Sequence, residues 1–271
     1  MCLKHVIGAL EVFDLKQRII TGLVLALIVI IPFWIGGWVL NVLFSGCVFI
    51  ASYEIVNIFK NKWPNYALVF IPLISALICF VATYYLNLLL PIVSFFILYL
   101  VLLTVIVENV EVTEISLVAF VHVILIFAIM SYVQASAINH LILFYVVIAT
   151  SGTDTGAYFV GSYLGKHKLS PRISPNKTVE GSIGGSVIGT IAASTFAYFV
   201  LNEQFSYKFV ILAFIITIVG QIGDLLFSAI KRHYGIKDFG SFLPGHGGIL
   251  DRIDSLLVSY MFLFAVLSWV L

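Results

Sequence analysis

Carboxylate, hydroxyl and basic side chains gather on two predicted helices near the C-terminus, at about 207–230 and 250–271. Spacings of three, four or seven residues place side chains on one face of a helix. Each helix therefore carries a carboxylate and hydroxyl stripe, and the Pro-Gly-His-Gly-Gly turn between them is suited to bringing their ends together. The first stripe consists of Gln221, Asp224, Ser228 and Lys231, and the second of Asp251, Ser255 and Ser259 with Asp254 beside them.

Carboxylate and hydroxyl oxygens flanked by lysine and arginine suit a hard divalent ion that holds phosphate groups. Mg²⁺ prefers a few carboxylate oxygens and shares its other positions with water and substrate phosphate, and basic residues would neutralise the phosphate oxygens. The alternative is an ion-paired helix cap, because an aspartate at the N-terminus of a helix is favourable by itself. Polar groups beside membrane helices are costly unless used, so we favour a reaction site. The predicted metal ligands are Asp154, Asp224, Asp251 and Asp254.

His246 lies between glycines in the turn that joins the two helices. A lone histidine is most often structural, and no second histidine stands at a spacing that would complete a zinc site. The functional alternatives are acid–base work or a hydrogen bond to phosphate. Phosphoryl-type transfer needs charge neutralisation and alignment more than a strong base.

A second polar cluster lies upstream, around residues 151–158 and 174–181. Asp154 falls near the end of a predicted span. In the Ser-Pro-Asn-Lys-Thr stretch, Thr178 or Ser174 could cap the following helix, and Glu180 would complement the helix dipole. Ser174 and Lys177 are the better candidates for contact with a substrate.

The composition predicts an all-α, polytopic integral membrane protein. The chain is 62% hydrophobic, above the roughly 45–50% of a soluble domain, and a spanning helix needs about 20 mainly apolar residues. The apolar runs are long and do not alternate with polar residues, so helices are favoured over a β-barrel. The nine predicted spans lie at about 19–36, 38–59, 66–86, 88–107, 115–135, 139–160, 181–201, 207–230 and 250–271.

The distribution of basic residues predicts the orientation of the spans. If the N-terminus is cytoplasmic, every lysine and arginine except Lys208 falls on the cytoplasmic side, as the positive-inside rule requires. The long loops 161–180 and 231–249 then face the cytoplasm as well. We therefore expect a protein of the cell (inner) membrane whose site faces the cytoplasm.

The two halves of the chain differ in polarity, although we expect one membrane domain. Residues 1–18 form a cytoplasmic segment, 19–149 a transmembrane scaffold and 150–271 a catalytic region. Glu54 and His122 are the ionisable exceptions within the apolar spans of the scaffold. We interpret them as a satisfied structural pair or an interface contact, although intramembrane ionisable groups can also mark a proton path.

Glycines recur every fourth residue along one face of the predicted span 181–201, at Gly181, Gly185 and Gly189. This spacing lets two helix backbones approach closely, so we predict a packing role. Gly181 lies at the helix start, where backbone N–H groups could also meet an anion.

The run from Ser228 to Asp254 reads Ser-x-Ile-Lys-Arg-x4-Lys-Asp-x-Gly-x2-Leu-Pro-x-His-Gly-Gly-Ile-x-Asp-Arg-Ile-Asp. This run resembles the signature of the CTP:phosphatidate cytidylyltransferases, the CDP-diacylglycerol synthases. The Asp-Thr-Gly-Ala-Tyr stretch at 154–158 and the Ser-Pro-Asn-Lys-Thr-Val-Glu-Gly stretch at 174–181 look like the same family. The resemblance covers roughly residues 14–271, with the N-terminal half similar only in its hydrophobic pattern.

The resemblance implies that phosphatidic acid attacks the α-phosphate of CTP and yields CDP-diacylglycerol and pyrophosphate. It also implies Mg²⁺ on Asp224 and Asp251 with Ser228 nearby, a monovalent cation such as K⁺ beside it, and a homodimer. The residues expected to act in catalysis are Asp224, Lys231, His246 and Asp251. Those expected to contact the substrates are Ser174, Lys177, Ser228, Arg232, Lys237, Asp238, Gly247, Gly248 and Arg252.

Three other classes remain open on the residues alone. A secondary transporter also uses intramembrane carboxylates and glycine-broken helices, but such proteins usually show repeated halves, and none is visible here. A related enzyme could transfer a nucleotide to another lipid phosphate. A non-catalytic membrane scaffold would leave the clustered carboxylates unexplained. No nucleic-acid partner is expected.

Overall fold

The computed structural model describes residues 26–201, 206–243 and 247–270. Within these residues, eight helical segments are long and apolar enough to cross a membrane, which confirms the polytopic helical prediction. The predicted span 19–36 lies partly outside the described residues, and its described part is the short helix Ala26–Ile35. The helices are α2 (Gly37–Asn57), α3 (Asn65–Tyr84), the 3₁₀ turn η1 (Leu86–Leu88) with α4 (Leu89–Ile106), α5 (Val112–Ile138), α6 (Leu141–Leu164), α7 (Val179–Val200), α8 (Tyr207–His233) and α9 (Leu250–Val270).

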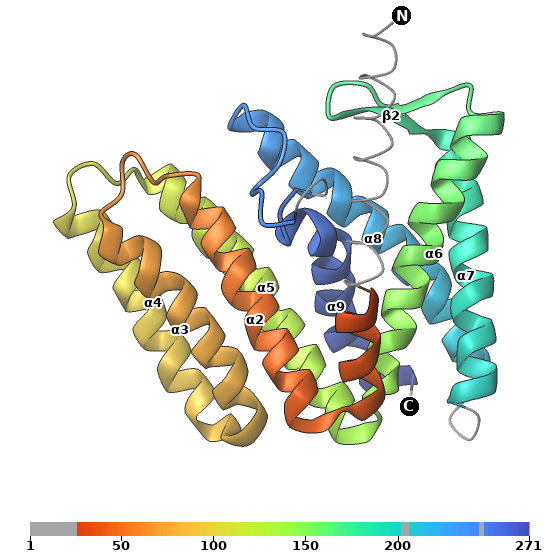
Figure 1. Ribbon diagram of the computed structural model, residues 1–271, viewed down its shortest axis with the longest axis horizontal. Helices are drawn as coiled ribbons and strands as arrows, with labels where there is room; N and C mark the ends of the chain where they lie inside the picture. Colours follow the sequence, from red (N-terminus) through yellow and green to blue (C-terminus); the bar gives the residue numbers. More distant parts are fainter. Residues whose placement is uncertain (1–25, 202–205, 244–246, 271) are drawn as a thin grey trace, which may run out of the picture.

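Successive helices run in opposite directions, so the loops after α2, α4, α6 and α8 lie at one end of the molecule, uppermost in Figure 1. The described basic residues belong to segments at that end, except Lys208 at the opposite start of α8 and Arg252 in the first turn of α9. The structure therefore gathers most of the basic residues at one end of the bundle.

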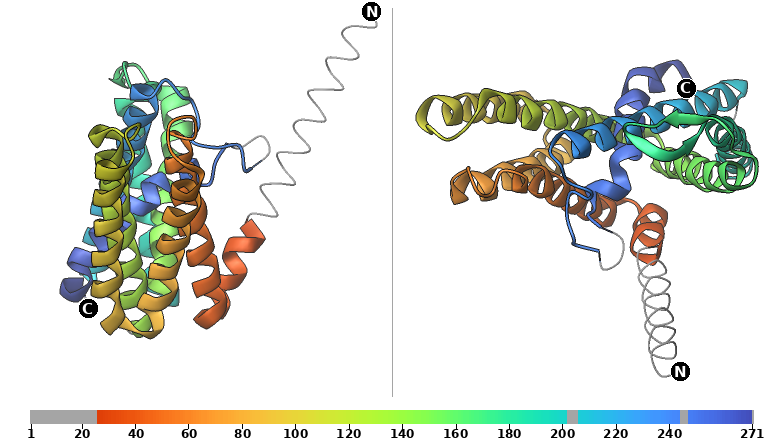
Figure 2. Two further views of the ribbon diagram at one scale, coloured as in Figure 1. Left: turned by 90° about the vertical axis from the view of Figure 1, so that its left-hand side faces the viewer. Right: turned by 90° about the horizontal axis from the view of Figure 1, so that it is seen from above.

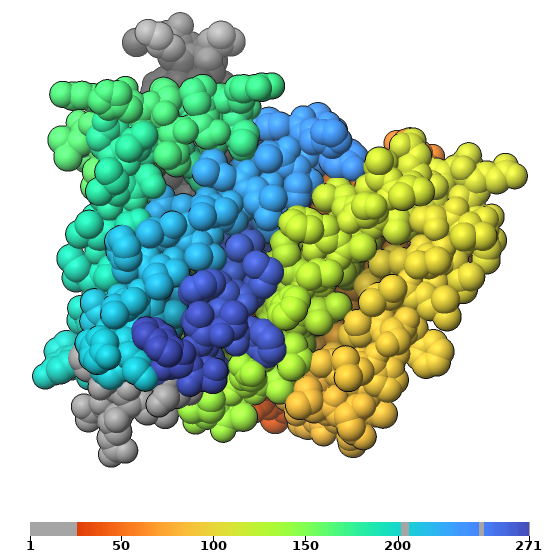
Figure 3. Space-filling model, turned by 180° about the vertical axis from the view of Figure 1, so that it is seen from behind, coloured from red at the N-terminus to blue at the C-terminus, as the bar shows by residue number. Residues whose placement is uncertain are grey.

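Helices α2 to α5 form two rows that extend to one side of the molecule, and α6 and α7 stand at the other side (Figure 2). Helices α8 and α9 lie between these groups, and Figure 3 shows both at the surface seen from behind. Contacts of α9 with α5 and α8 join the scaffold helices to the rest. The predicted boundary at 149/150 falls inside α6, so the two halves share a continuous helix.

Helices α6 and α7 pack closely because glycines line their interface. A Cβ atom added at Gly185 would come within 2.6 Å of the Thr153 carbonyl oxygen, and one added at Gly181 within 2.8 Å of the Ala157 carbonyl oxygen. Added at Gly189, it would lie 2.6 Å from the Ala149 carbonyl oxygen. The packing role predicted from the four-residue glycine spacing is confirmed.

A short β-hairpin precedes α7, which the all-α prediction did not include. Strands β1 (Lys168–Ser170) and β2 (Ser174–Thr178) pair antiparallel. Pro175 removes a backbone donor, which a two-stranded ribbon tolerates because its outer edges are unpaired. Thr178 then begins α7 as its N-cap, with its side-chain oxygen accepting from the Gly181 N–H at 3.1 Å, as predicted.

Candidate active site

Helices α6 to α9 and the hairpin line an open cavity of about 810 Å³ that carries many polar side chains. Seven of the residues predicted to bind metal or substrate or to act in catalysis line it, and they come from α6, α8, α9 and the hairpin. The acidic and basic residues lining the cavity are Asp154, Lys168, Lys177, Asp224, Lys231, Asp251, Arg252 and Asp254. The bundle thus brings charges from segments far apart in sequence to one place.

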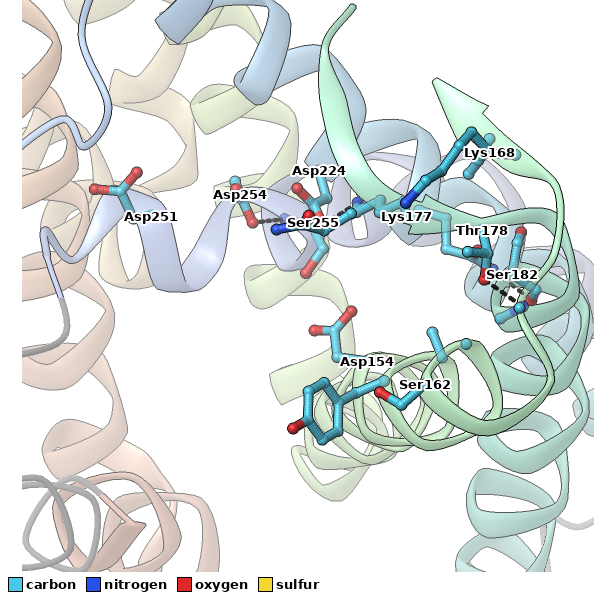
Figure 4. Close-up of a pocket in the computed structure, with 18 of the residues that line it drawn as sticks. Asp154, Ser162, Lys168, Lys177, Thr178, Ser182, Asp224, Asp251, Asp254 and Ser255 are labelled. Atoms are coloured by element: carbon cyan, nitrogen blue, oxygen red, sulfur yellow. Dashed lines mark hydrogen bonds and ion pairs between the residues drawn. The ribbon is translucent and has the colours of Figure 1, made fainter. Parts of the chain in front are cut away.

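Three carboxylates face one another across this cavity. Asp154 projects from α6 toward Asp224 on α8 and Asp254 on α9, with Ser255 beside them (Figure 4). Asp254 is buried, and its Oδ1 accepts from the Ser255 backbone N–H at 2.7 Å. Like charges gathered with little water attract cations strongly, so this side of the cavity suits a bound cation.

Asp224 is paired with a lysine from the hairpin. The Lys177 ammonium forms an ion pair with its Oδ2, and the Ser228 hydroxyl donates to its Oδ1 at 3.2 Å. Both charged side chains are 28% exposed, so the pair borders the cavity rather than the packed interior. Lys177 thereby carries positive charge from the hairpin directly to the acidic group.

Asp251 is paired with a lysine from α8 and lies apart from the other carboxylates in Figure 4. The Lys231 ammonium lies 2.7 Å from its Oδ1, while its Oδ2 accepts from the backbone N–H groups of Phe239 at 2.8 Å and Gly248 at 3.1 Å. Its side chain is only 5% exposed. Asp251 therefore holds the loop before α9 as well as facing the cavity, so part of the helix-cap alternative applies to it.

The oxygen donors around the cavity fit Mg²⁺ shared with a phosphate group. Among the described residues, no three histidine, cysteine, aspartate or glutamate side chains are close enough to hold a metal ion by themselves. Mg²⁺ usually takes one or two carboxylates and fills its remaining positions with water and substrate phosphate. Asp224 and Asp251 each hold a lysine ammonium at the place where a cation's charge would act.

Several predicted contact residues lie outside the cavity lining, namely Ser174, Ser228, Arg232, Lys237, Asp238, Gly247 and Gly248. Ser228 reaches the site through Asp224, whereas the Arg232 Nε donates to the Ile173 carbonyl oxygen at 3.3 Å. Lys237 and Asp238 are exposed. His246 lies outside the described residues, so its predicted role stays a prediction.

Some cavity residues were not predicted from the sequence. Tyr158 and Ser162 line the cavity from α6, and Asn176 and Ser182 line it from the hairpin and α7. A signal for two of them was present, because Asp154, Tyr158 and Ser162 recur every four residues and so share a helix face. Burying a neutral polar residue in a membrane costs less free energy than burying a charged one, so its presence in a predicted span is a weaker sign of function.

The two isolated ionisable residues of the scaffold have separate partners and do not form a pair with each other. Glu54 accepts from the backbone N–H groups of Ile249 and Leu250, at 3.0 and 2.7 Å. The His122 Nε2 lies 2.8 Å from the Ser52 hydroxyl, and its Nδ1 lies 2.6 Å from the Val118 carbonyl oxygen. The interface-contact interpretation is therefore confirmed for Glu54, and His122 is satisfied within the scaffold.

The fold and the site define a polytopic membrane protein whose cavity combines carboxylates with lysines and an arginine. This combination is suited to an enzyme that transfers phosphate-containing groups. The model of the cytidylyltransferase family matches residues 16–270, so the chain belongs to this family and is a nucleotidyltransferase. The chain is 36% identical to the phosphatidate cytidylyltransferase of Bacillus subtilis (strain 168), over 94% of this chain and 98% of that protein. It is 47% identical to the phosphatidate cytidylyltransferases of Staphylococcus haemolyticus (strain JCSC1435) and Staphylococcus aureus (strain COL), each over 43% of both chains.

Proposed function

We propose that this chain is a phosphatidate cytidylyltransferase of phospholipid biosynthesis, which joins CTP and phosphatidic acid into CDP-diacylglycerol and pyrophosphate. The observation that carries the proposal is the meeting of Asp154, Asp224 and Asp254 with Lys177 and other basic groups in one cavity among membrane helices. One substrate is water-soluble and the other lies in the bilayer, so a site among membrane helices is suited to both. The relative similar over nearly its whole length supports this choice of substrates.

The proposed reaction is a displacement at phosphorus. A phosphate oxygen of phosphatidic acid forms a bond to the α-phosphorus of CTP, and the bond from that phosphorus to the bridging oxygen of the β-phosphate breaks. Pyrophosphate leaves with the electron pair of the broken bond. The attacking oxygen is already ionised at neutral pH, so the protein must align the groups and neutralise their charge more than remove a proton.

Lys177 and Lys231 are the groups we propose to neutralise the phosphates. Each holds an aspartate in the structure described here. An incoming phosphate carries more negative charge than a carboxylate and can take over the ammonium group. Arg252 lines the same cavity and offers a planar donor pair suited to phosphate.

We propose that Asp224 and Asp251 hold Mg²⁺, with Asp154 and Asp254 adding negative charge nearby. When bound, Mg²⁺ would neutralise phosphate oxygens and help to orient them. A second, monovalent cation such as K⁺, and assembly into a homodimer, are part of the same proposal. These four carboxylates belong to α6, α8 and α9, and together they would supply the negative charge that holds a cation in the cavity.

We propose that the protein lies in the cell (inner) membrane with the loop end of the bundle facing the cytoplasm. The clustering of basic residues at that end supports this orientation. Ser241 is exposed in the loop before α9 and suits a cysteine label. In a Ser241→Cys variant free of native cysteines, we expect an impermeant thiol reagent to react from the cytoplasmic side. Reaction from outside only would reverse the orientation.

The activity is tested with purified protein, labelled CTP, phosphatidic acid and Mg²⁺ in detergent micelles. We expect a labelled product that partitions into organic solvent, together with pyrophosphate. Product formed with another lipid phosphate but not with phosphatidic acid would move the assignment to a different lipid substrate. A folded protein that is inactive with every lipid phosphate would overturn the proposal and favour a transporter.

A further inference from the structure

The side chain of Glu54, a glutamate of the scaffold, contacts the start of α9. Glu54 belongs to α2, is 3% exposed, and each of its carboxylate oxygens accepts one backbone hydrogen bond from the start of α9. The donors are Ile249 at 3.0 Å and Leu250 at 2.7 Å. This contact joins residues about 195 positions apart in the chain and crosses from one half of the molecule to the other.

The contact satisfies groups that a helix cannot satisfy by itself. The first N–H groups of a helix have no partner within it, and the partial positive charge of that end favours an anion. Asp251 uses one of its oxygens to accept from Gly248 and Phe239, upstream of the helix. The next two N–H groups, of Ile249 and Leu250, are those that Glu54 accepts from.

Two glycines make room for this carboxylate. A Cβ atom added at Gly248 would come within 2.5 Å of the Glu54 Oε1. One added at Gly240 would overlap the same oxygen, and the three atoms nearest to it all belong to Glu54. Gly240 has no positive φ, so only the close approach of Glu54 requires glycine there. The loop before α9 is thus shaped around the glutamate.

The first turns of α9 carry Asp251, Arg252, Asp254 and Ser255 into the cavity. A helix whose first turn shifts or frays moves these groups together. We propose that Glu54 is a positioning residue for the transfer reaction. It acts by fixing the start of α9, and hence the α9 carboxylates, from the scaffold side. The proposal rests on the proposed function for its kinetic consequence, but its structural consequence can be measured without activity.

The first experiment compares Glu54→Gln with Glu114→Gln in the full-length protein. Glu114 is also a buried scaffold carboxylate, 4% exposed, but it accepts from the Trp63 indole N–H at 2.7 Å and from the Lys62 ammonium at 2.8 Å, and neither partner belongs to α9. Glutamine at position 54 keeps the size but turns an amide NH₂ toward one of the two N–H donors. We expect kcat to fall about 10- to 100-fold, the range for residues that orient charged ligands. A higher Mg²⁺ requirement should accompany the fall, and neither change should appear in Glu114→Gln.

Hydrogen exchange provides the readout that does not depend on catalysis. We expect faster amide exchange across residues 247–255 in Glu54→Gln than in the wild type, and no change there in Glu114→Gln. This result together with an inactive wild type would reject the proposed function but keep the anchoring of α9. Unchanged exchange, or equal losses of activity in both glutamine variants, would overturn the positioning role.

The second experiment tests the contact between Gly240 and the Glu54 side chain. Gly240→Ala alone should reduce activity, because its methyl group overlaps Glu54. In a Glu54→Ala background the overlap is gone, so adding Gly240→Ala should cause less than about a 2-fold further loss, as contacting sites are expected to be non-additive. The matched control is Gly46→Ala on the same scaffold helix, where an added Cβ meets nothing within 4 Å. If the fold-loss of activity in the double variant equals the product of the losses in the two single variants, the proposed contact is contradicted.

Discussion

Buried polar groups are used differently in the scaffold helices and in the helices around the cavity. In the scaffold, His122 has a serine on one ring nitrogen and a backbone carbonyl on the other. Around the cavity, Asp224 and Asp251 are paired with lysines across elements and border open space. The first kind of contact fixes packing. The second kind can exchange partners when a phosphate or a cation enters.

The buried carboxylates Glu114 and Asp254 show the same difference between the scaffold and the cavity. Glu114 is held by the Trp63 indole and by the Lys62 ammonium, near the loop end of the molecule. Asp254 is equally buried, but it lies beside a cavity of about 810 Å³ rather than within packed side chains. A buried charge without such a cavity serves stability. A buried charge beside one is available for chemistry.

The largest expected effect comes from neutralising a cavity carboxylate. Asp251→Asn should lower kcat by at least about 100-fold, because a charge positioned for transferring groups is lost. The thermal midpoint should fall as well, because Asp251 also pairs with Lys231 and accepts from the Phe239 and Gly248 backbone N–H groups, so turnover is compared per folded protein. Turnover is measured in parallel with Glu108→Gln, an exposed carboxylate of the α4–α5 loop that should behave like the wild type. Near-normal turnover of Asp251→Asn at limiting Mg²⁺ would mean that Asp251 does not hold the metal.

The next largest effect is expected from removing a basic group of the cavity. Lys177→Met removes the hairpin's ion pair with Asp224. We expect KM for CTP to rise about 10-fold, since one charge-assisted contact to phosphate is lost, and Lys177→Arg to restore part of the affinity. The measurement is a CTP titration at saturating phosphatidic acid. A KM that stays at the wild-type value would assign Lys177 to folding of the hairpin instead.

A packing change should affect stability more than chemistry. Gly185→Ala puts a methyl group 2.6 Å from the Thr153 carbonyl oxygen, between α6 and α7. We expect a loss of about 1–3 kcal/mol, typical of overpacking, seen as a lower thermal midpoint in detergent. Gly37→Ala is no control because Gly37 has a positive φ, whereas Gly46→Ala adds a methyl group in open space. Equal midpoints for the Gly185 and Gly46 variants would disprove the close α6–α7 packing.

The smallest expected effect lies at the surface of the scaffold. The Lys62 ammonium holds the pKa of Glu111 below its usual range through a hydrogen bond. A carboxyl whose folded pKa is depressed stabilises the protein above its unfolded pKa, and this contribution is lost as the pH falls through the folded pKa. The thermal midpoint of Glu111→Gln, which keeps the pair of Lys62 with Glu114, should therefore lie slightly below that of the wild type at neutral pH, and the gap should close in acid. The Lys62 and Glu111 side chains are both more than half exposed, so added salt should also shrink the gap. A gap that widens in acid would contradict this account.

Several features of the structure were predicted correctly from local sequence patterns. The eight described spans lie within a few residues of their predicted limits, since hydropathy is a local property of the chain. Thr178 was predicted as a cap from the residues beside it, and it is one. The Gly185 contact was predicted from a four-residue period. Each of these features depends on neighbours within one or two helical turns.

Other features depend on pairings that no local pattern encodes. The hairpin 168–178 was missed because its strands are short and polar. The Lys177 pair with Asp224 joins residues 47 positions apart, and the contact of Glu54 with Ile249 joins residues 195 positions apart. Such pairings follow from which helices pack together, and many helix arrangements would satisfy the same hydropathy pattern.

The limits of the described spans, the shared side of the basic residues and the cluster of polar residues near the C-terminus were all predictable from local sequence patterns. Hydrophobic length, charge distribution and helical period suffice for these, because each acts over a short stretch of chain. Three other features were not predictable in this way: which lysine faces which aspartate, the meeting of Asp154 with the α8 and α9 carboxylates, and the hold of Glu54 on the start of α9. The packing of helices distant in sequence sets these contacts, and it minimises unsatisfied polar groups over the whole bundle at once.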